Sequence, residues 1–260
     1  MTNSVAGVRR RETSPRRDGR AQVIAVDGPS GSGKSSAARA TASALGLRYL
    51  DTGAMYRAVT WWMLEHNVDL DDTAKVARHT LDLSIDVSTD PEVQWIKVDG
   101  IDVSAEIRKR RVSNVVSLVA AVPEVRACLI AQQQAIIKEA EQTGGIVAEG
   151  RDIGTVVAPG AAVKVYLTAS EQVRAERRAA ELAGRQAVEH VPSQPSSGGA
   201  DGDSPPSAAV TRAEQAQRDR RDAPQSQMAA DAIEIDATDL ALDEVVGRIV
   251  GLADAQQAHT

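Results

Sequence analysis

One stretch near the start of the chain limits the possible folds more than any other. Residues 28–35 contain two glycines separated by four residues and followed by Lys34 and Ser35, in the order Gly28, Pro29, Ser30, Gly31, Ser32, Gly33, Lys34, Ser35. An apolar run, residues 23–26, comes before them, and an Ala-rich helix-forming segment, residues 36–45, comes after. The order strand, glycine-rich turn, helix predicts a phosphate-binding loop, named here the phosphate loop (residues 28–35).

The chemistry of this loop follows from its residue types. Glycine allows positive φ and a close approach of main-chain N–H groups to a polyanion, and the helix that follows adds the positive end of its dipole. Lys34 is placed to reach the β and γ phosphates of a nucleotide, and the Ser35 hydroxyl to hold Mg²⁺. The alternative is a glycine-rich hairpin without a ligand, which the strand and helix on either side disfavour.

Composition sets limits on the class of protein. The 260 residues are 42% hydrophobic, which allows a real core, but only 2% aromatic, which disfavours a surface that stacks single-stranded bases. The net charge of −6 also disfavours a general nucleic-acid binder. The single cysteine, Cys128, has no partner for an internal disulfide, and no run approaches the ~18 apolar residues of a membrane span. We expect a cytoplasmic protein.

Strand-like and helix-like segments alternate along most of the chain. This order predicts an α/β fold, a parallel sheet with helices on both faces, spanning residues 21–254. Residues 66–122 interrupt it with short strands and a hairpin signal at Asp99-Gly100, so we expect an insert there. Residues 1–20 contain six arginines without apolar periodicity and predict a disordered basic tail, and residues 255–260 a short C-terminal tail.

Charged residues follow two of the predicted strands at the edge where ligands bind in such sheets. Asp51 and Thr52 follow the second strand and are placed to cap a helix, with Arg57 one turn later able to clamp a second phosphate group. A solvent-exposed helix arginine is the alternative for Arg57. Glu149, Arg151 and Asp152 lie in one tight turn after a buried strand, which favours a functional site over a simple helix cap.

Two charged segments late in the chain, residues 170–186 and 208–222, predict helices. Pro-, Ser- and Gly-rich residues 190–207 join them, so residues 172–225 predict a mobile lid with a flexible tip. Arg174 and Arg178 share a helix face, where like charges cost stability unless an anion arrives.

A phosphate loop alone does not distinguish a kinase from a GTPase or an ATPase. No Asn begins the Asn-Lys-x-Asp base reader of a GTPase, and no apolar run ends in the paired acids usual in motor ATPases. Arginines in several segments suggest more anionic charge than one triphosphate carries, which favours transfer between two phosphate-bearing molecules.

Four motifs together resemble the bacterial cytidylate kinases over about residues 22–251. They are Gly28 to Ser36, the run Leu50-Asp51-Thr52-Gly53-Ala54-Met55-Tyr56-Arg57, the run Asp102 to Arg108, and the run Glu149-Gly150-Arg151-Asp152-Ile153-Gly154-Thr155. The resemblance implies ATP-dependent, Mg²⁺-dependent phosphorylation of CMP and dCMP by a monomer that binds neither nucleic acid nor membrane.

The resemblance also implies roles for individual residues. The catalytic set is Lys34, Arg57, Arg151 and Asp152; the ATP-binding set is Gly28 to Ser36 with Arg178; and Ser35 is the metal ligand. Arg57 and Arg151 would bind the CMP phosphate, and Arg218 and Asp222 its ribose and phosphate, with Thr52 beside them. Ser117, Arg126 and Asp152 would bind the cytosine ring. An exocyclic amine needs an acceptor such as Asp152, whereas uracil reverses the polarity at that position.

The chain departs from the family pattern in two places. The family usually has a further arginine and a Pro-Leu segment after its lid arginines, where this chain has Ala223, Pro224 and Gln225, and the stretch 190–207 is unusual. Two other hypotheses remain open: a phosphate-loop kinase for another small acceptor, such as shikimate or a different nucleotide, and a non-catalytic regulator or nucleic-acid-binding protein that uses the basic tail.

Overall fold

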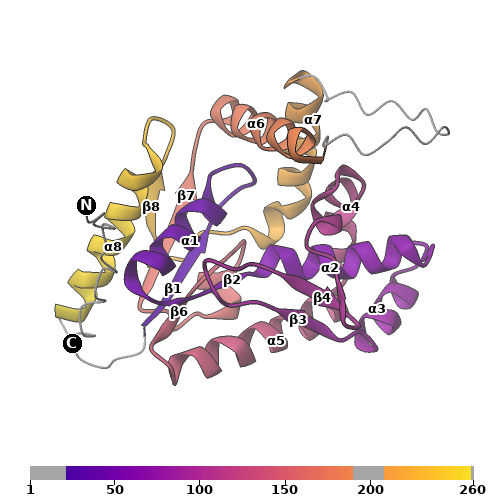
Figure 1. Cartoon of the computed structure of the whole chain (residues 1–260), viewed down its shortest axis with the longest axis horizontal. Helices are drawn as coiled ribbons and strands as arrows, with labels where there is room; N and C mark the ends of the chain where they lie inside the picture. The colour runs from indigo at the N-terminus through magenta and orange to yellow at the C-terminus, as the bar shows by residue number, and fades with distance from the viewer. Residues whose placement is uncertain (1–21, 190–207, 259–260) are drawn as a thin grey trace, which may run out of the picture.

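A five-stranded parallel sheet organises the chain in this computed structural model, which describes residues 22–189 and 208–258. The predicted basic tail and the predicted lid tip lie outside the described residues. The strand order is β2-β6-β1-β7-β8, so all carboxyl ends meet at one edge (Figure 1). The strands are β1 (Gln22–Asp27), β2 (Arg48–Asp51), β6 (Gly145–Gly150), β7 (Val163–Thr168) and β8 (Ile233–Asp236).

Alternation of apolar side chains along the strands separates two cores, one on each face of the sheet. On β1, Val23 and Ala25 belong to the first core, and Ile24 and Val26 to the second. The first core packs against α2 (Thr52–Glu65) and α5 (Pro123–Glu141), and the second against α1 (Lys34–Leu45) and α8 (Leu242–Ala258). The predicted α/β fold with helices on both faces is confirmed.

The register of the sheet determines which side chains reach the ligand edge. Asp27 pairs with Gly150 at the ends of β1 and β6, and Asp51 pairs with Glu149 at the ends of β2 and β6. Asp51 then caps α2, its carboxylate accepting a hydrogen bond from the Ala54 N–H at 2.9 Å. Acidic groups from three strands therefore lie side by side at this edge.

The predicted insert contains a three-stranded antiparallel sheet of β3 (Ile85–Val87), β4 (Ile96–Val98) and β5 (Ile101–Asp102). Asp99 and Gly100 form the hairpin turn with φ of 50° and 80°. Helix α3 (Thr73–Leu81) begins at Thr73, because the Asp72 side chain caps it by accepting a hydrogen bond from the Lys75 N–H. A short helical turn, η1 (Glu106–Arg108), leads into α4 (Arg110–Ala120).

Helices α6 (Glu171–Glu189) and α7 (Ala208–Asp222) pack on each other above the ligand edge (Figure 1). The C-terminal tail expected from residue 255 is helical as far as Ala258. Within the described ranges, no single helix is long and apolar enough to cross a membrane. Helices α4 and α5 meet that test only as a pair, bent by 99°.

Candidate active site

The phosphate loop turns from β1 into α1 through glycines that no other residue replaces without strain. Gly28 has a φ of 146°, and a Cβ there would lie 2.0 Å from the Leu167 carbonyl oxygen on β7. Gly33, at φ 96°, is the N-cap of α1. Lys34 is the first residue of the helix and donates from Nζ to the Pro29 carbonyl at 2.8 Å. The loop thus holds the lysine at the positive end of the helix dipole.

A hydroxyl and a buried carboxylate lie at the base of this loop. Ser35 Oγ donates to Glu149 Oε1 at 2.5 Å, and the Tyr49 hydroxyl donates to the same oxygen at 3.2 Å. Burial, with Asp51 nearby, raises the pKa of Glu149. Burial, with Arg151 nearby, lowers the pKa of Lys34. Both shifts show groups whose charges are only partly compensated within the protein.

A cavity of about 190 Å³ opens next to the loop, over the carboxyl ends of β2 and β6. Predicted residues from widely separated stretches of sequence line it together: Ser30, Gly31, Lys34, Ser35, Thr52, Arg57, Ser117, Arg126, Arg151, Asp152, Arg178, Arg218 and Asp222. We name it the acceptor cavity. The residues proposed for the second substrate therefore share one space with the loop lysine.

Six arginines line this cavity, and four of them come from separate segments of the chain: Arg57, Arg151, Arg178 and Arg218. Arg57 and Arg178 both donate to the Ser113 hydroxyl, at 2.8 and 3.3 Å. Burial, followed by the charges of Arg218 and Arg178, lowers the pKa of Arg57 well below its usual value. Burial and Arg151 lower the pKa of Arg218 to about 10. Cations held this close favour an anion between them.

Polar groups of the acceptor cavity bind residues at the end of α7 and just after it. Arg126 on α5 binds the Asp152 carboxylate and donates to Gln225 Oε1 at 3.0 Å. Ser117 on α4 donates to Asp222 at 2.8 Å, and Arg151 forms an ion pair with Asp222 at 3.0 Å. Each predicted base-binding group thus has a protein partner, and two of the partners come from the end of α7 or just after it.

A second cavity, of about 370 Å³, lies on the other side of the loop and is named the donor cavity. Its polar wall is the loop from Gly31 to Ser36, and its apolar wall includes Leu240, Leu242 and Val245. Lys34 and Arg178 line both cavities. The two cavities therefore meet at the loop lysine, which is the geometry required for transfer between two bound molecules.

Comparison with known proteins agrees with this geometry. The family model for cytidylate kinase matches residues 24–193. The chain belongs to the cytidylate kinase family. It is 42% identical to a cytidylate kinase of Streptomyces avermitilis over 92% of this chain and 95% of that protein, and 44% identical to one of Nocardia farcinica over 92% and 95%. It is also 44% identical to a bifunctional pantoate ligase/cytidylate kinase of Thermosynechococcus vestitus, over 90% of this chain and 43% of that protein.

Some predicted residues of this cytidylate kinase homologue contribute only through the backbone or lie outside the cavities. Gly28 and Pro29 line neither cavity, and their carbonyls accept from Arg151 at 2.6 Å and from Lys34. Arg174 shares a helix face with Arg178 but is buried, donating to the Ser30 carbonyl at 3.1 Å and pairing with Asp219. Arg174 therefore links α6 and α7 to the phosphate loop.

Sequence reasoning missed several groups that shape the cytidylate kinase site. Asp27 accepts hydrogen bonds from the N–H groups of Ile153 and Gly154, both at 2.8 Å, and so fixes the turn that carries Asp152. Arg177 donates to the Ser32 carbonyl at 3.2 Å and lines the donor cavity. Gln225 accepts a hydrogen bond from Arg126. The one signal available in the sequence was that Asp27 is an acidic residue at the end of a predicted strand, as Asp51 and Glu149 are.

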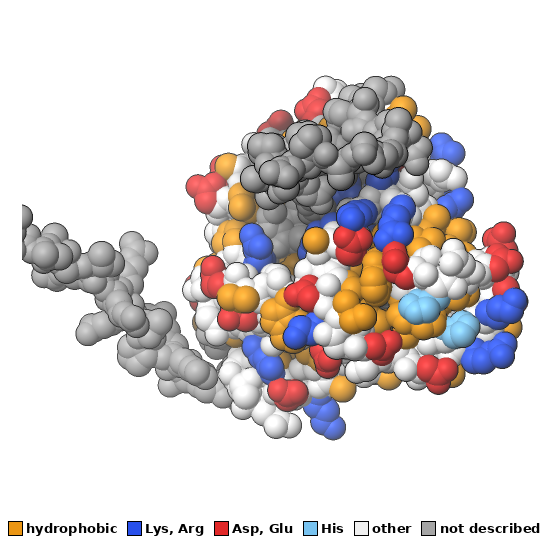
Figure 2. Space-filling view, turned by 45° about the vertical axis from the view of Figure 1, so that its right-hand side comes forward, with side chains coloured by type: hydrophobic (Ala, Val, Ile, Leu, Met, Phe, Trp, Pro, Cys, Tyr) orange, Lys and Arg blue, Asp and Glu red, His pale blue; other side chains and the backbone are white. Residues whose placement is uncertain are grey.

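The histidines that the structure describes lie away from the two cavities. The two histidines within the described ranges, His66 and His79, pack against Trp62 with ring centroids 3.8 and 5.3 Å away. Figure 2 shows pale blue histidine side chains on the surface of one face, and neither His66 nor His79 lines the donor or the acceptor cavity.

Proposed function

We propose that this protein transfers the terminal phosphoryl group of ATP to CMP and dCMP, giving ADP with CDP or dCDP. The observation that carries the proposal is the acceptor cavity, which brings Lys34, the converging arginines and the Arg126–Asp152 pair into one space. Family membership supports the same reaction. Phosphoryl transfer needs both reactants in line and their negative charge neutralised, and these residues supply both requirements.

On this proposal, the donor cavity holds ATP with its phosphates on the loop N–H groups and Lys34. The apolar wall of Leu240, Leu242 and Val245 suits the adenine ring. Lys34 donates to the Pro29 carbonyl in this structure, and a phosphate oxygen would replace that partner. Arg178 lines both cavities and would neutralise charge on the phosphoryl group in transit.

The same proposal includes Mg²⁺. Ser35 Oγ and Glu149 Oε1 are hard oxygen donors 2.5 Å apart, of the kind that Mg²⁺ prefers. Within the described part of the chain, no group of three His, Cys, Asp or Glu side chains could hold a metal by itself. This donor set fits an ion that takes its remaining ligands from nucleotide phosphates and water, where it would neutralise their charge.

For the acceptor, Arg57, Arg151 and Arg218 would bind the CMP phosphate and Thr52 and Asp222 would lie beside its ribose. Arg57 and Arg218 have pKa values lowered mainly by burial and by neighbouring arginines, and an anion between them relieves that repulsion. Binding energy from the phosphate would thus be largest where the cations are most crowded.

Cytosine would be recognised by Asp152, Arg126 and Ser117. The Asp152 carboxylate accepts from the exocyclic amine, and Arg126 and Ser117 donate to the ring carbonyl and nitrogen. Ser117 and Arg126 now bind Asp222 and Gln225, so the base would exchange these partners with the lid. A uracil carbonyl opposite Asp152 leaves a buried acceptor unpaired, which disfavours UMP.

The remaining parts of the proposal concern organisation. Residues 66–122 act as the acceptor-binding insert and residues 172–225 as a lid on a single kinase domain. The enzyme is a cytoplasmic monomer that needs neither nucleic acid nor a membrane, and residues 1–20 take no part in catalysis. The single Cys128 suits a reducing compartment.

An acceptor panel tests the proposed function. ADP release is followed with ATP·Mg²⁺ and CMP, dCMP, UMP, AMP or shikimate in turn. CMP and dCMP should give the highest kcat/KM. Equal rates with AMP and CMP, or turnover with shikimate alone, would point to a kinase for another acceptor. Nucleotide binding without turnover of any acceptor would favour a regulator.

A further inference from the structure

One amide in the core lacks the partners that a buried amide normally has. Gln133 on α5 is 1% exposed, and neither its Oε1 nor its Nε2 makes a hydrogen bond. The Tyr56 hydroxyl on α2 is also buried without a hydrogen-bond partner. Buried polar groups are nearly always paired, and each unpaired group lowers stability. Two such groups therefore lie unpaired on neighbouring helices, α2 and α5.

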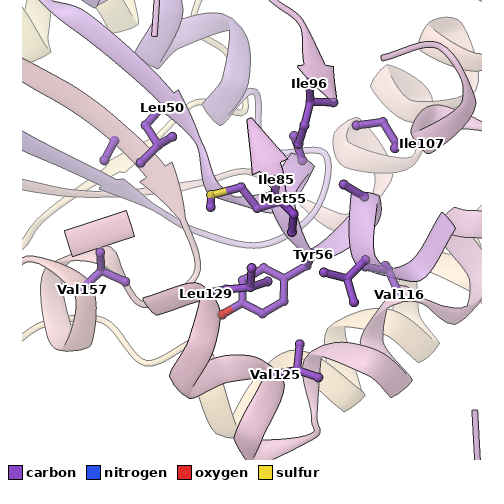
Figure 3. Packing of buried hydrophobic residues seen from close by; sticks show 14 of the residues in the cluster. Leu50, Met55, Tyr56, Ile85, Ile96, Ile107, Val116, Val125, Leu129 and Val157 are labelled. Atoms are coloured by element: carbon purple, nitrogen blue, oxygen red, sulfur yellow. The ribbon is translucent and has the colours of Figure 1, made fainter. Parts of the chain in front are cut away.

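Tyr56 connects this amide to the acceptor cavity. The tyrosine lines the cavity, and Figure 3 shows its ring packed beside Leu129, which lies one helical turn before Gln133 on α5. Burial and the Asp152 carboxylate raise the pKa of Tyr56 to about 12, while Arg126 and the adjacent Gln133 amide oppose that rise. Tyr56 therefore shares one cavity with Arg126 and Asp152, and its hydroxyl is influenced by the Gln133 amide.

A base in the acceptor cavity would change what Asp152 needs. In this structure Arg126 holds the Asp152 carboxylate and also donates to Gln225. When Arg126 turns toward a ring carbonyl, an oxygen of Asp152 is left to find another donor. The Tyr56 hydroxyl, which lines the same cavity as Asp152 and has no hydrogen-bond partner, can supply such a donor. A Tyr56 hydroxyl that donates to Asp152 can at the same time accept a hydrogen bond from Gln133 Nε2. That second bond keeps the Tyr56 O–H group pointing toward Asp152.

We propose that Gln133 is a positioning residue for nucleobase selection: its amide holds the Tyr56 hydroxyl in a hydrogen-bonded line that ends on Asp152. The line keeps the carboxylate oriented as an acceptor for an exocyclic amine when Arg126 binds the ring. Gln133 touches neither substrate and acts only through Tyr56. This inference rests on the proposed function, because it names what fixes the base-binding carboxylate of that same site.

The experiment compares full-length Gln133→Met and Tyr56→Phe variants with the parent protein. Both remove hydrogen-bonding groups and keep most of the volume. We expect KM for CMP to rise about 5- to 10-fold, and the CMP to UMP ratio of kcat/KM to fall by about the same factor, with KM for ATP unchanged. The double variant should lose no more than either single variant, because both changes break one line. Tm of Gln133→Met should equal or exceed that of the parent, since an unpaired buried amide is removed.

The matched control is Ile137→Val on the same helix, at a core position that is 6% exposed. It should lower Tm and leave the CMP to UMP ratio unchanged, so a loss of selectivity is not a general effect of altering α5. Parental CMP selectivity in Gln133→Met, or additive losses in the double variant, would overturn the inference.

If the parent protein does not phosphorylate CMP, the proposed function fails. In that case the Tm values of the two single variants and the double variant test the Tyr56–Gln133 contact by itself. A change in the double variant that differs from the sum of the single changes supports the contact, and additive changes refute it. Should Gln133→Met fail to fold, Tyr56→Phe alone must show the selectivity loss.

Discussion

Replacing Asp152 by Asn should weaken the discrimination between CMP and UMP. The Asp152 side chain is 9% exposed and pairs with Arg126, whose side chain is 19% exposed, so solvent screens this carboxylate little. A hydrogen bond to a charged group in such a place contributes about 1.5–3 kcal/mol, or about 10- to 150-fold in kcat/KM. Asn keeps the volume and offers an N–H₂ group that suits the uracil carbonyl. We therefore expect a lower kcat/KM for CMP and a higher kcat/KM for UMP. The CMP to UMP ratio of kcat/KM should decrease by about 10- to 150-fold.

Steady-state ADP release with each acceptor measures the ratio, and KM for ATP reports whether the donor side is intact. Asp231→Asn is the matched control, because Asp231 also forms an ion pair, with Lys164 at 2.7 Å, but its side chain is 67% exposed and lines neither cavity. That variant should behave like the parent. A CMP to UMP ratio unchanged by Asp152→Asn would remove the carboxylate from base recognition and refute the reasoning.

Other predictions concern the phosphate loop and the tail. Lys34→Ala should abolish turnover in the ADP-release assay, since it removes the phosphate-loop cation at the point where the cavities meet; residual turnover above a few per cent would contradict this. Burial and Arg151 lower the pKa of Lys34 to about 8, and a bound triphosphate should raise it, so ATP binding at pH 8.5 should take up about 0.7 proton. Calorimetry in buffers of different ionisation enthalpy measures this, and Lys34→Arg should show no uptake. Gly28→Ala should lower the free energy of unfolding by more than about 3 kcal/mol in urea titrations, because a Cβ would lie 2.0 Å from the Leu167 carbonyl oxygen; a smaller loss would mean the loop relaxes easily. Removal of residues 1–20 should leave kcat/KM for CMP unchanged within twofold, and a large loss would give the tail a catalytic role.

The phosphate loop and the strand-end turns could be predicted because their signals are local. Strand, glycines, lysine and helix follow one another in sequence, and the continuous apolar runs of β1 and β6, which are buried along their whole length, make these strands evident. Asp152 and Arg57 were predicted for the same reason, since the carboxyl ends of parallel strands meet at one edge.

The contacts that complete the site could not be predicted, because they join residues far apart in the chain. Asp27 fixes the turn at Ile153 from 126 residues away, and Arg126 meets Gln225 across 99 residues. Arg174 looked like an anion ligand from its spacing to Arg178, but the packing of α6 directs it to the Ser30 carbonyl and Asp219. The unpaired amide of Gln133 gives no sequence signal, since a helix glutamine is ordinarily on the surface.

The central claim is that two nucleotides bind at once, one on each side of Lys34 and Arg178. A bisubstrate compound, adenosine joined to cytidine through a polyphosphate chain, tests it most directly in equilibrium binding. The account predicts a Kd at least about 100-fold lower than that of ATP, competition with both ATP and CMP, and much weaker binding of the compound with uridine in place of cytidine. Affinity no better than that of ATP, with no competition against CMP, would contradict the claim.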